Sequence, residues 1–539
     1  MVNEQNSKNN EKHPSIFEPI PLIFNAAIAV FGAIIGLQLI TTLGVSPNTS
    51  IIGALIAILV SRIPLEFFKN FRSIHHQNLM QTSISSATFG AANSLMIPIG
   101  VPFLIGKPEL VMPMLIGAAL AMFTDATILY KLFDSDIFPA SNAWPPGVAT
   151  AESILAADKG GKRASLLGIG ILLGIIGSYL KISMSAFGIA FIGNIWALTM
   201  FGIGLLIRQY STSLFGIDVN KLYIPHGIMI GAGLVALIQI IMIFRKSRDV
   251  KGKSEEENKK VRLTRTPGET KQTIEIGFVA YLVVASTIAL LGGLVAKMSF
   301  GMLIVFIIFA ALAAYFHELI VGISAMHSGW FPAFAVAFVT LLIGMIIGFP
   351  PVALALLVGY SASTGPAFAD MGYDLKAGYI LRGMGMNPQL ELEGRKQQYI
   401  TAMIAFGVAL LVVIFSHQTY FLQNLVPPVD RVYVSTIKAG TSPEVAKQLL
   451  IWAIPGAIVQ LIGGPSRQIG VLFATGLLIL NPNAGWAVLA GVIIRGIMIK
   501  IKGKEAEIPM SILAAGFIAG DALYSFFSSM FHVKAIKTK

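Results

Sequence analysis

The residues from Trp144 to Glu152 combine helix-breaking, small and charged side chains inside a very hydrophobic chain. They read Trp-Pro-Pro-Gly-Val-Ala-Thr-Ala-Glu, with apolar runs on both sides. Two prolines and a glycine predict a break in a helix, and a carboxylate follows within the next turn. Lipid cannot hydrogen-bond a broken backbone or a charge, so such a segment is tolerated at membrane depth where it lines a polar cavity. We expect part of a substrate path here, the alternative being a tight helix-packing corner of small residues.

Three further groups of polar residues could act on a substrate or a proton. The amides of Gln77–Thr82 open an apolar segment, where they could bind substrate or make interhelical hydrogen bonds. Asp370 and Asp374 are four residues apart, hence on one face of a helix, with Lys376 nearby. They could sense protons, hold a substrate amine, or form an interfacial salt-bridge cluster. Asp521 lies midway through an apolar run, where a buried carboxylate must be paired, hydrated or protonated; we favour a function over a structural hydrogen bond.

Other ionisable residues in the apolar runs stand alone in the sequence. Asp125 and Glu318 are isolated acids, and no sequence argument pairs them. His226 opens an apolar run, where it could ligate a metal, relay protons or be structural. Arg495 could be an internal partner for an acid or extend to the cytosolic surface.

The elements that must position these residues are membrane helices. The chain has 539 residues, 55% of them hydrophobic and only 12% charged, with a mean hydropathy of +0.75. Apolar runs of roughly 17–25 residues match the hydrocarbon thickness of a bilayer. We therefore predict an all-α polytopic membrane protein with about 14–16 transmembrane helices, in two related halves with broken or re-entrant segments. The absence of cysteine excludes disulfides, thiolate metal sites and a cysteine nucleophile.

Charge predicts the topology and the organisation of the chain. The net charge of +12 is better explained by basic cytosolic loops than by nucleic-acid binding. If these loops lie in the cytosol, we expect both termini of this multi-pass protein to face the cytosol too. We expect the protein to be located in the cell membrane. The expected parts are a cytosolic tail (1–19), a first transmembrane half (20–244), a charged cytosolic linker (245–273), a second transmembrane half (274–533) and a basic tail (534–539).

Five segments, in one order, resemble the oligopeptide transporter (OPT) family, especially its yellow-stripe-like branch, in a prokaryotic-type form. Trp144–Glu152 resembles the family's Pro-Ser-Gly-Thr-Ala-Thr-Ala signature, with Pro146 in place of the serine and Val148 in place of the first threonine. Gln77–Thr82 is similar to its Glu-Asn-Thr-x-x-Gln-Thr element, with Gln77 where the family often has Glu. The other three segments are Ile224–Gly227, Asp370–Tyr379 and Gly516–Tyr524. The resemblance covers about residues 20 to 535.

The resemblance implies a proton-coupled secondary transporter for peptides, peptide-like molecules or metal–chelate complexes, working by alternating access. No Gly-x-x-x-x-Gly-Lys-(Ser/Thr) loop is present, so the chain does not supply its own ATPase by that route. Lipids, substrate and protons are the expected partners, with a homodimer by analogy, and no cofactor, metal site or catalytic residue is expected. The predicted substrate-binding residues are Asn78, Gln81, Thr82, Pro146, Gly147, Thr150 and Glu152; the predicted proton-coupling residues are Asp521, Glu152 and Asp374.

Two other functions are weighed against transport. Intramembrane aspartyl proteases carry a Tyr-Asp on one helix and a Gly-x-Gly-Asp on another. This chain resembles them in Tyr373-Asp374 and in Gly520-Asp521. However, Ile518 stands where the first glycine should be, and too many spans are predicted. A passive channel is the other alternative, which accumulation of substrate against a gradient would exclude.

Overall fold

The computed structural model describes residues 13–44, 53, 56, 66–157, 162–254, 263–328, 333–440 and 442–537. Within these ranges the chain is almost entirely helical and contains no strand beyond one isolated bridge. Nine of the described helices are long and apolar enough to cross a membrane, and five shorter apolar helices accompany them. The predicted all-α polytopic membrane fold is confirmed. The expected tails and linker lie partly outside the described residues.

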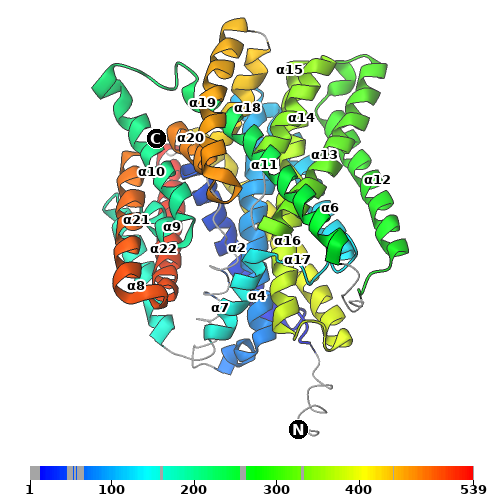
Figure 1. Ribbon diagram of the computed structural model, residues 1–539, viewed down its shortest axis with the longest axis vertical. Coiled ribbons are helices and arrows are strands. Elements are labelled where there is room, and N and C mark those ends of the chain that lie inside the picture. The colour runs from blue at the N-terminus through cyan, green and yellow to red at the C-terminus, as the bar shows by residue number, and fades with distance from the viewer. Residues whose placement is uncertain are drawn as a thin grey trace.

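The helices form an upright bundle, in which the amino-terminal half of the chain contributes both central and peripheral elements (Figure 1). Short 3-10 turns are labelled η, and η2 is a π-helical stretch. In the amino-terminal half the elements are α2 (Pro19–Thr42), η1 (Glu66–Arg72), α4 (Ile74–Phe89), η2 (Gly90–Met96), α5 (Ile97–Leu104), η3 (Pro108–Leu110), α6 (Val111–Leu132), α7 (Pro145–Ala157), α8 (Lys162–Tyr179), α9 (Met184–Ile192), α10 (Ile195–Phe215) and α11 (Ile224–Ser254).

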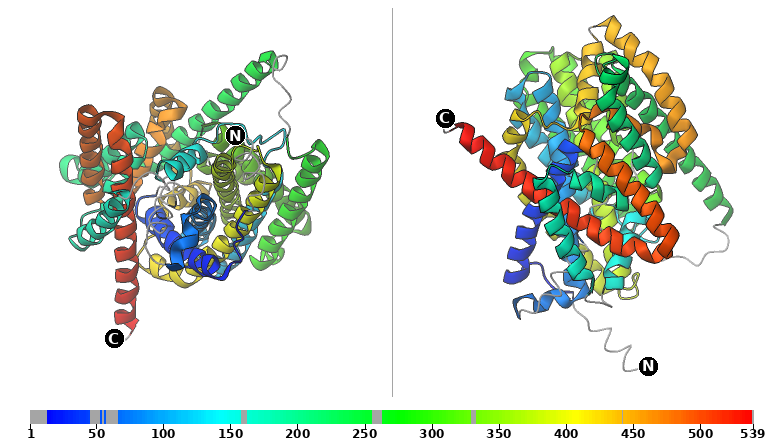
Figure 2. Two further views of the ribbon diagram at one scale, coloured as in Figure 1. Left: turned by 90° about the horizontal axis from the view of Figure 1, so that it is seen from below. Right: turned by 90° about the vertical axis from the view of Figure 1, so that its left-hand side faces the viewer.

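The carboxyl-terminal half is built in the same way, from long helices joined by short connections. Its last helix extends away from the bundle (Figure 2). The elements are α12 (Pro267–Leu291), η4 (Leu294–Ala296), α13 (Phe300–Ser328), α14 (Ala333–Ile347), α15 (Pro351–Ser363), α16 (Pro366–Leu381), α17 (Pro388–Leu422), α18 (Pro428–Ala439), α19 (Pro443–Arg467), α20 (Ile469–Leu478), α21 (Pro482–Lys502), η5 (Gly503–Ala506) and α22 (Glu507–Lys537).

Two interrupted helical segments occupy the centre of the molecule. In the most apolar stretches of Ile74–Leu104 and Pro351–Leu381, 83% and 94% of the residues are buried, against 17–61% in the other long helices described. The first segment runs through the π-helical η2, and the second is broken between α15 and α16 at Gly365, whose φ is +99°. Because α15 packs on α5 and α16 packs on α4, the two segments are antiparallel.

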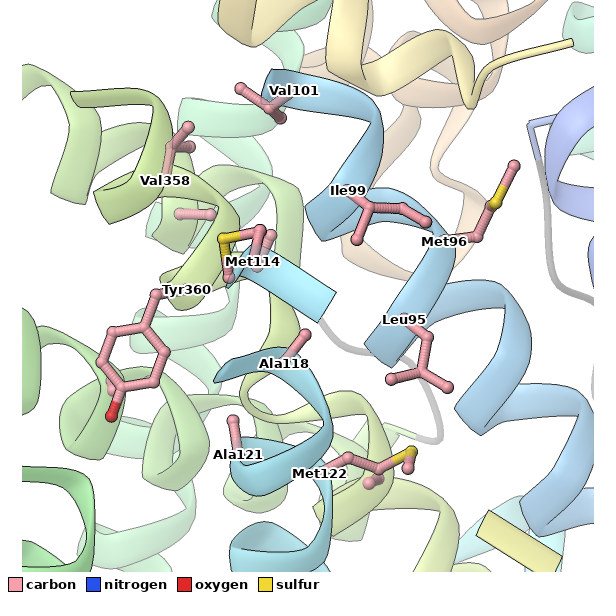
Figure 3. Packing of buried hydrophobic residues seen from close by; sticks show 14 of the residues in the cluster. Leu95, Met96, Ile99, Val101, Met114, Ala118, Ala121, Met122, Val358 and Tyr360 are labelled. Carbon is pink, nitrogen blue, oxygen red and sulfur yellow. The ribbon is translucent and has the colours of Figure 1, made fainter. Parts of the chain in front are cut away.

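Apolar packing fixes these central segments in place. Side chains of η2, α5, α6 and α15 meet in one large buried cluster, which includes Leu95, Ile99, Met114 and Tyr360 (Figure 3). A second cluster joins α2, α9, α10, α21 and α22 beside it. Other helices therefore enclose most of the surface of the two central segments.

The Trp144–Glu152 segment starts a helix, whereas the sequence predicted a break in one. Pro145 and Pro146 are the first two residues of α7, where a proline lacks only a donor that would be unpaired anyway. The residue before them, Trp144, is fully buried, and its backbone N–H donates to the carbonyl of Met326 at 2.8 Å. The expected break therefore lies in the loop that precedes α7.

Helices extend into both ends of the expected linker. α11 continues to Ser254, and α12 begins at Pro267. A capping box starts α12, because the Thr266 hydroxyl accepts from the Glu269 N–H while the Glu269 carboxylate accepts from the Thr266 N–H. The functional division of the chain into two halves stays a prediction.

Candidate functional site

A buried group of polar side chains lies where α4 meets α16. We call Asn78, Gln81, Ser85, Ser86, Asp370 and Asp374 the carboxylate–amide cluster. The Gln81 amide donates to Asp374 Oδ1 at 2.5 Å, and Ser86 donates to Oδ2 at 3.3 Å. Ser85 donates to Asp370 Oδ1 at 2.6 Å, and Asn78 donates to Gln81 Oε1 at 3.1 Å. Helical spacing brings each set of polar residues to one face, so these two helices hold the cluster rigidly.

No cation accompanies these two carboxylates among the described residues. Neither Asp370 nor Asp374 takes part in an ion pair there, although both are fully buried. Lys376, which the sequence placed beside them, donates instead to the carbonyl of Ala140 at 2.8 Å. The interfacial salt-bridge cluster considered from the sequence is therefore not what these residues form. Such acids need a proton or a cationic ligand to be stable.

Gln398 joins this cluster to a second, fully charged group. Its amide donates to the Asp374 carbonyl at 2.7 Å and to the Thr82 hydroxyl at 3.1 Å, and its oxygen accepts from Arg382 at 2.7 Å. Thr82 is thus held beside the cluster, through an amide from α17. Gln398 is thus a hydrogen-bonded link between the two groups.

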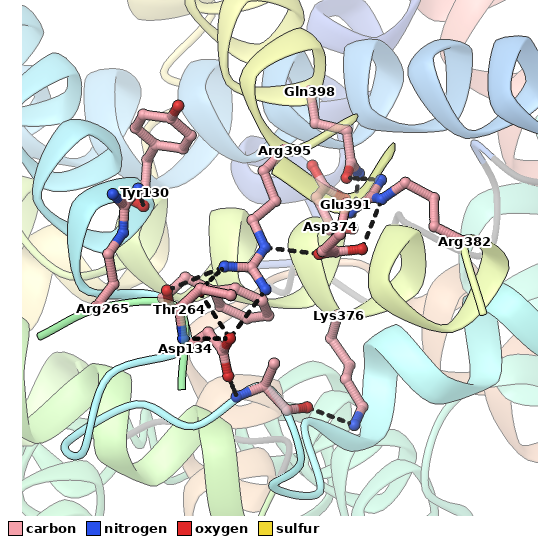
Figure 4. A network of polar contacts seen from close by, with 12 residues as sticks. Tyr130, Asp134, Thr264, Arg265, Asp374, Lys376, Arg382, Glu391, Arg395 and Gln398 are labelled. Carbon is pink, nitrogen blue, oxygen red and sulfur yellow. Dashed lines mark hydrogen bonds and ion pairs between the residues drawn. The ribbon is translucent and has the colours of Figure 1, made fainter. Parts of the chain in front are cut away.

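The second group is the arginine network of Asp134, Arg382, Glu391 and Arg395 (Figure 4). Glu391 accepts from Arg382 Nε at 2.8 Å and from Arg395 Nε at 2.6 Å, and Arg395 Nη2 also contacts Asp134 at 3.2 Å. Every charge in this network has an opposite charge beside it, which is the condition for a buried ion pair to persist. The network ties α16 and α17 to the loop after α6.

A third group joins α6, α12 and α13, and we call Asp125, Tyr281 and Glu318 the acid–phenol triad. The Tyr281 hydroxyl lies 2.5 Å from Asp125 Oδ1 and also contacts Glu318 Oε2. Asp125 Oδ2 accepts from the Gly365 N–H at 2.5 Å, and all three side chains are fully buried. The sequence singled out Asp125 and Glu318 without pairing them, because the phenol that joins them belongs to a third helix.

Comparison with known proteins gives the family. The model of the family described as OPT oligopeptide transporter protein matches residues 22–222 and 209–532. The chain belongs to this family. No curated protein gives a match. Family members are membrane transporters of oligopeptides, so the protein is a multi-pass membrane transporter. Its assignment to the yellow-stripe-like branch and its prokaryotic type stay predictions.

In this OPT protein, α7 packs against α16 beside the carboxylate–amide cluster. A Cβ on Gly147 would lie 2.5 Å from the Tyr373 carbonyl oxygen, so the helices touch backbone to backbone there. The Thr150 hydroxyl donates to the carbonyl of Pro146 in its own helix, whereas Glu152 is exposed. The segment is thus a close-packed corner made by small residues, next to polar groups of another helix. That it also lines a substrate path stays a prediction.

Asp521 lies in a different part of the OPT protein. Its carboxylate accepts from the Ser185 N–H at 2.8 Å, in the first turn of α9. That contact caps a buried helix start, as Asp often does. Asp374 accepts hydrogen bonds from Gln81 and Ser86, so the contacts give no support to a protease dyad of Asp374 and Asp521. The role of Asp521 in proton coupling stays a prediction.

Two other residues noted in the sequence, His226 and Arg495, contact neighbouring parts of the fold. His226 is buried at the start of α11, where its ring lies 5.6 Å from that of Tyr223. Arg495 donates to the carbonyls of Ala190 and Gly193, at 3.3 and 2.6 Å, and so caps the carboxyl-terminal end of α9. In the described residues, no three His, Asp or Glu side chains are grouped to hold a metal ion.

An apolar groove of about 460 Å³ lies between α2 and α17 of the transporter. Its lining contains none of the predicted site residues, and Val30, Leu411 and Phe415 in it are 40%, 53% and 75% exposed. A lipid chain suits such a lining, whereas the charged ends of a peptide do not. We therefore expect lipid and not substrate in this groove.

Proposed function

We propose that the protein is a proton-coupled secondary transporter that takes up small peptides, peptide-like molecules or their metal chelates by alternating access. The observation that carries the proposal is the carboxylate–amide cluster, which lies between the two interrupted central segments and contains acids without a cation. Discontinuous helices form the substrate and ion sites of many transporters. Intramembrane acids facing a protein interior commonly mark substrate or proton pathways.

The chemistry of the cluster suits the ends and bonds of a short peptide. Asp370 and Asp374 can accept hydrogen bonds from a protonated amino terminus, which would supply the missing positive charge. The amides of Asn78 and Gln81 can pair with peptide N–H and C=O groups, since each amide both donates and accepts. In this proposal α7, with Pro146, Gly147, Thr150 and Glu152, lies along the route from one face of the membrane to the cluster.

Proton coupling needs a group that exchanges protons with each side in turn. Asp374 is our candidate within the cluster, because its carboxylate is buried and has only neutral donors. Glu152 and Asp521 stay candidates from the sequence. We further propose that the termini are cytosolic, that the cell membrane is the location, and that a homodimer forms.

Uptake by purified protein in liposomes tests this proposal. Small peptides, glutathione-like thiols and iron chelates are compared under an imposed pH gradient. We expect accumulation of one class above the external concentration, abolished by a protonophore. Equilibration without accumulation identifies a passive channel instead.

The variant Asp374→Asn tests the cluster in the same assay. It removes a charge-assisted hydrogen bond worth roughly 1.5–3 kcal/mol, so we expect at least about a tenfold rise in KM for the peptide. Glu109→Gln is the control, because Glu109 is exposed and contacts only Lys107, 3.8 Å away, in an ion pair. Equal KM values for wild type and Asp374→Asn contradict a binding role for the cluster.

A further inference from the structure

The acid–phenol triad has more acidic groups than its hydrogen bonds can satisfy without an added proton. A phenol hydroxyl carries one proton and can donate it to one oxygen only. Tyr281 nevertheless contacts both Asp125 Oδ1 and Glu318 Oε2. Both contacts are satisfied together when one carboxyl group is protonated and donates to the phenol oxygen, while the phenol donates to the other acid. In that arrangement the triad holds one proton more than two ionised acids and a phenol would hold.

Nothing charged compensates the two acids from the surrounding helices. The titratable groups that face the triad are Tyr315 of α13 and Tyr360 of α15, both neutral phenols. His317 turns its Nδ1 to Ser361 at 3.0 Å, and Tyr360 donates to the backbone carbonyl of Tyr281 at 3.0 Å. In the described residues, no Lys or Arg forms an ion pair with Asp125 or Glu318.

An independent observation indicates that the triad is incomplete as it stands. Glu318 is fully buried, and its second oxygen, Oε1, has no hydrogen-bond partner. A buried polar atom without a partner costs free energy of about 1–3 kcal/mol, more when the group is charged. Such an atom needs an explanation, and the smallest ligand that can satisfy a carboxylate oxygen is a proton.

Asp125 also connects the triad to the break between α15 and α16. Asp125 Oδ2 accepts from the N–H of Gly365, the residue that precedes α16. A carboxylate at this position is stabilised by the positive end of the helix dipole, and a neutral acid loses that attraction. Protonation at Asp125 therefore weakens the contact that fixes the start of α16, the helix that carries Asp370 and Asp374.

We propose that Asp125, Tyr281 and Glu318 form the proton-binding site of the transport cycle, and that Asp125 transmits its protonation state to α16. In the cycle, one proton from the outer solution binds a carboxylate of the triad and is released to the inner solution after α16 has moved. This inference rests on the proposed function, proton-coupled transport, and puts the triad in the place of Asp374 as the site of the coupled proton. It assigns coupling to α6, α12 and α13 and substrate binding to α4 and α16.

Two transport assays on the same liposomes test it. Exchange of labelled for unlabelled substrate requires no net proton movement, whereas accumulation driven by a pH gradient does. We expect Glu318→Gln and Asp125→Asn to lose pH-driven accumulation while keeping exchange. Tyr281→Phe removes the shared hydroxyl and should shift the pH profile of accumulation. The matched control is Glu275→Gln, because Glu275 lies exposed on α12, the helix that carries Tyr281.

Each outcome has a separate meaning. Wild type that accumulates no substrate under a pH gradient overturns the proposed function, and with it this site. Glu318→Gln that accumulates like wild type overturns the triad alone. Wild type that accumulates substrate under a sodium gradient and not under a pH gradient overturns the proton coupling of the proposed function, and with it this site. Infrared difference spectra supply a readout without transport, since the carbonyl band of a protonated carboxyl group should be present in wild type and altered in Glu318→Gln and Asp125→Asn.

Discussion

Buried acids in this protein fall into two groups, according to whether a cation accompanies them. Glu391 has a guanidinium on each side, so its charge is balanced in every state of the molecule. The carboxylate–amide cluster and the acid–phenol triad have only neutral donors. Balanced charges hold a structure in place, whereas unbalanced ones change with the arrival of a proton or a cationic ligand. The arginine network is therefore part of the scaffold, and the other two groups are where function should lie.

The scaffold role of Glu391 can be measured. Glu391→Gln leaves Arg382 and Arg395 without their shared partner, so we expect a loss of about 3–5 kcal/mol in the free energy of unfolding. Unfolding by denaturant in detergent is the measurement. Glu393→Gln is the control, because Glu393 is only half-buried and pairs with Lys396 over 3.9 Å. Its hydrogen bond from the Gln397 amide, 2.7 Å long, can also be accepted by a glutamine oxygen, so its effect should stay within about 1 kcal/mol. Similar losses of unfolding free energy in both variants would contradict the scaffold role of Glu391.

For single residues, the sequence predicted which polar side chains belong to the candidate site better than it predicted which side chains they contact. Gln81 and Asp374 were both selected, yet their contact joins residues 293 positions apart. No periodicity within one helix can report such a pair, because only the packing of α4 on α16 creates it. Tyr281 was missed altogether, since a tyrosine in an apolar run looks like one more aromatic side chain.

The elements of the molecule are positioned by close contacts between helix backbones. α7 approaches α16 at Gly147, and Gly372 of α16 receives the ring of Trp144 in return; a Cβ there would lie 2.0 Å from the indole. The two contacts interlock the loop before α7 with the helix that carries Asp370 and Asp374. The position of the acids therefore depends on small residues that carry no chemistry themselves.

Gly147→Ala tests this dependence. The new Cβ would meet the Tyr373 carbonyl, which is backbone and cannot rotate away, so α7 must move; we expect a loss of roughly 1–3 kcal/mol in stability together with slower uptake. Thermal unfolding and initial uptake rates are compared with those of Gly407→Ala. Gly407 has open space in α17, so its replacement should cost nothing and can gain up to about 1 kcal/mol. Unchanged stability in Gly147→Ala contradicts the close approach.

Helix existence was predictable from hydropathy, whereas helix boundaries and breaks were not. The two prolines of the Trp144–Glu152 segment begin α7, because the residues before them form a loop that returns the chain to α13. The actual breaks in the central segments lie at η2 and at Gly365. Neither has a proline–proline signal. Gly365 is followed by Pro366, which is a local signal for a break, whereas η2 contains no glycine–proline or proline–proline pair.

The described residues form two extensive apolar clusters, a larger and a smaller one, and a third of only four buried residues where α9 meets α22. The carboxylate–amide cluster and the triad lie among helices of the larger cluster, together with α6, α12, α13 and α15–α17. Asp521 lies on α22 beside residues of the smaller cluster, where it caps α9. This separation makes the two proposed roles of Asp521, as a helix cap and as a proton carrier, distinguishable.

We expect Asp521→Asn to retain uptake driven by a pH gradient, because an asparagine oxygen can still accept from the Ser185 N–H. Asp521→Ala removes the acceptor and should lower the free energy of unfolding by about 0.5–2 kcal/mol. Uptake and unfolding are measured on the same preparations. Loss of pH-driven uptake in Asp521→Asn, with stability unchanged, would instead support the proton-carrying role that the sequence suggested.

The arginine network also has a consequence for how the protein is made. Asp134 comes from the end of α6, Thr264 from just before α12, and Arg395 from α17; Arg395 contacts both of the others. These three segments leave the ribosome at widely separated times. A nascent chain that has not yet reached Pro388 holds Asp134 in the membrane without its guanidinium partner. This end of the bundle can therefore close only after α17 has been made, when Arg395 reaches Asp134 and Thr264.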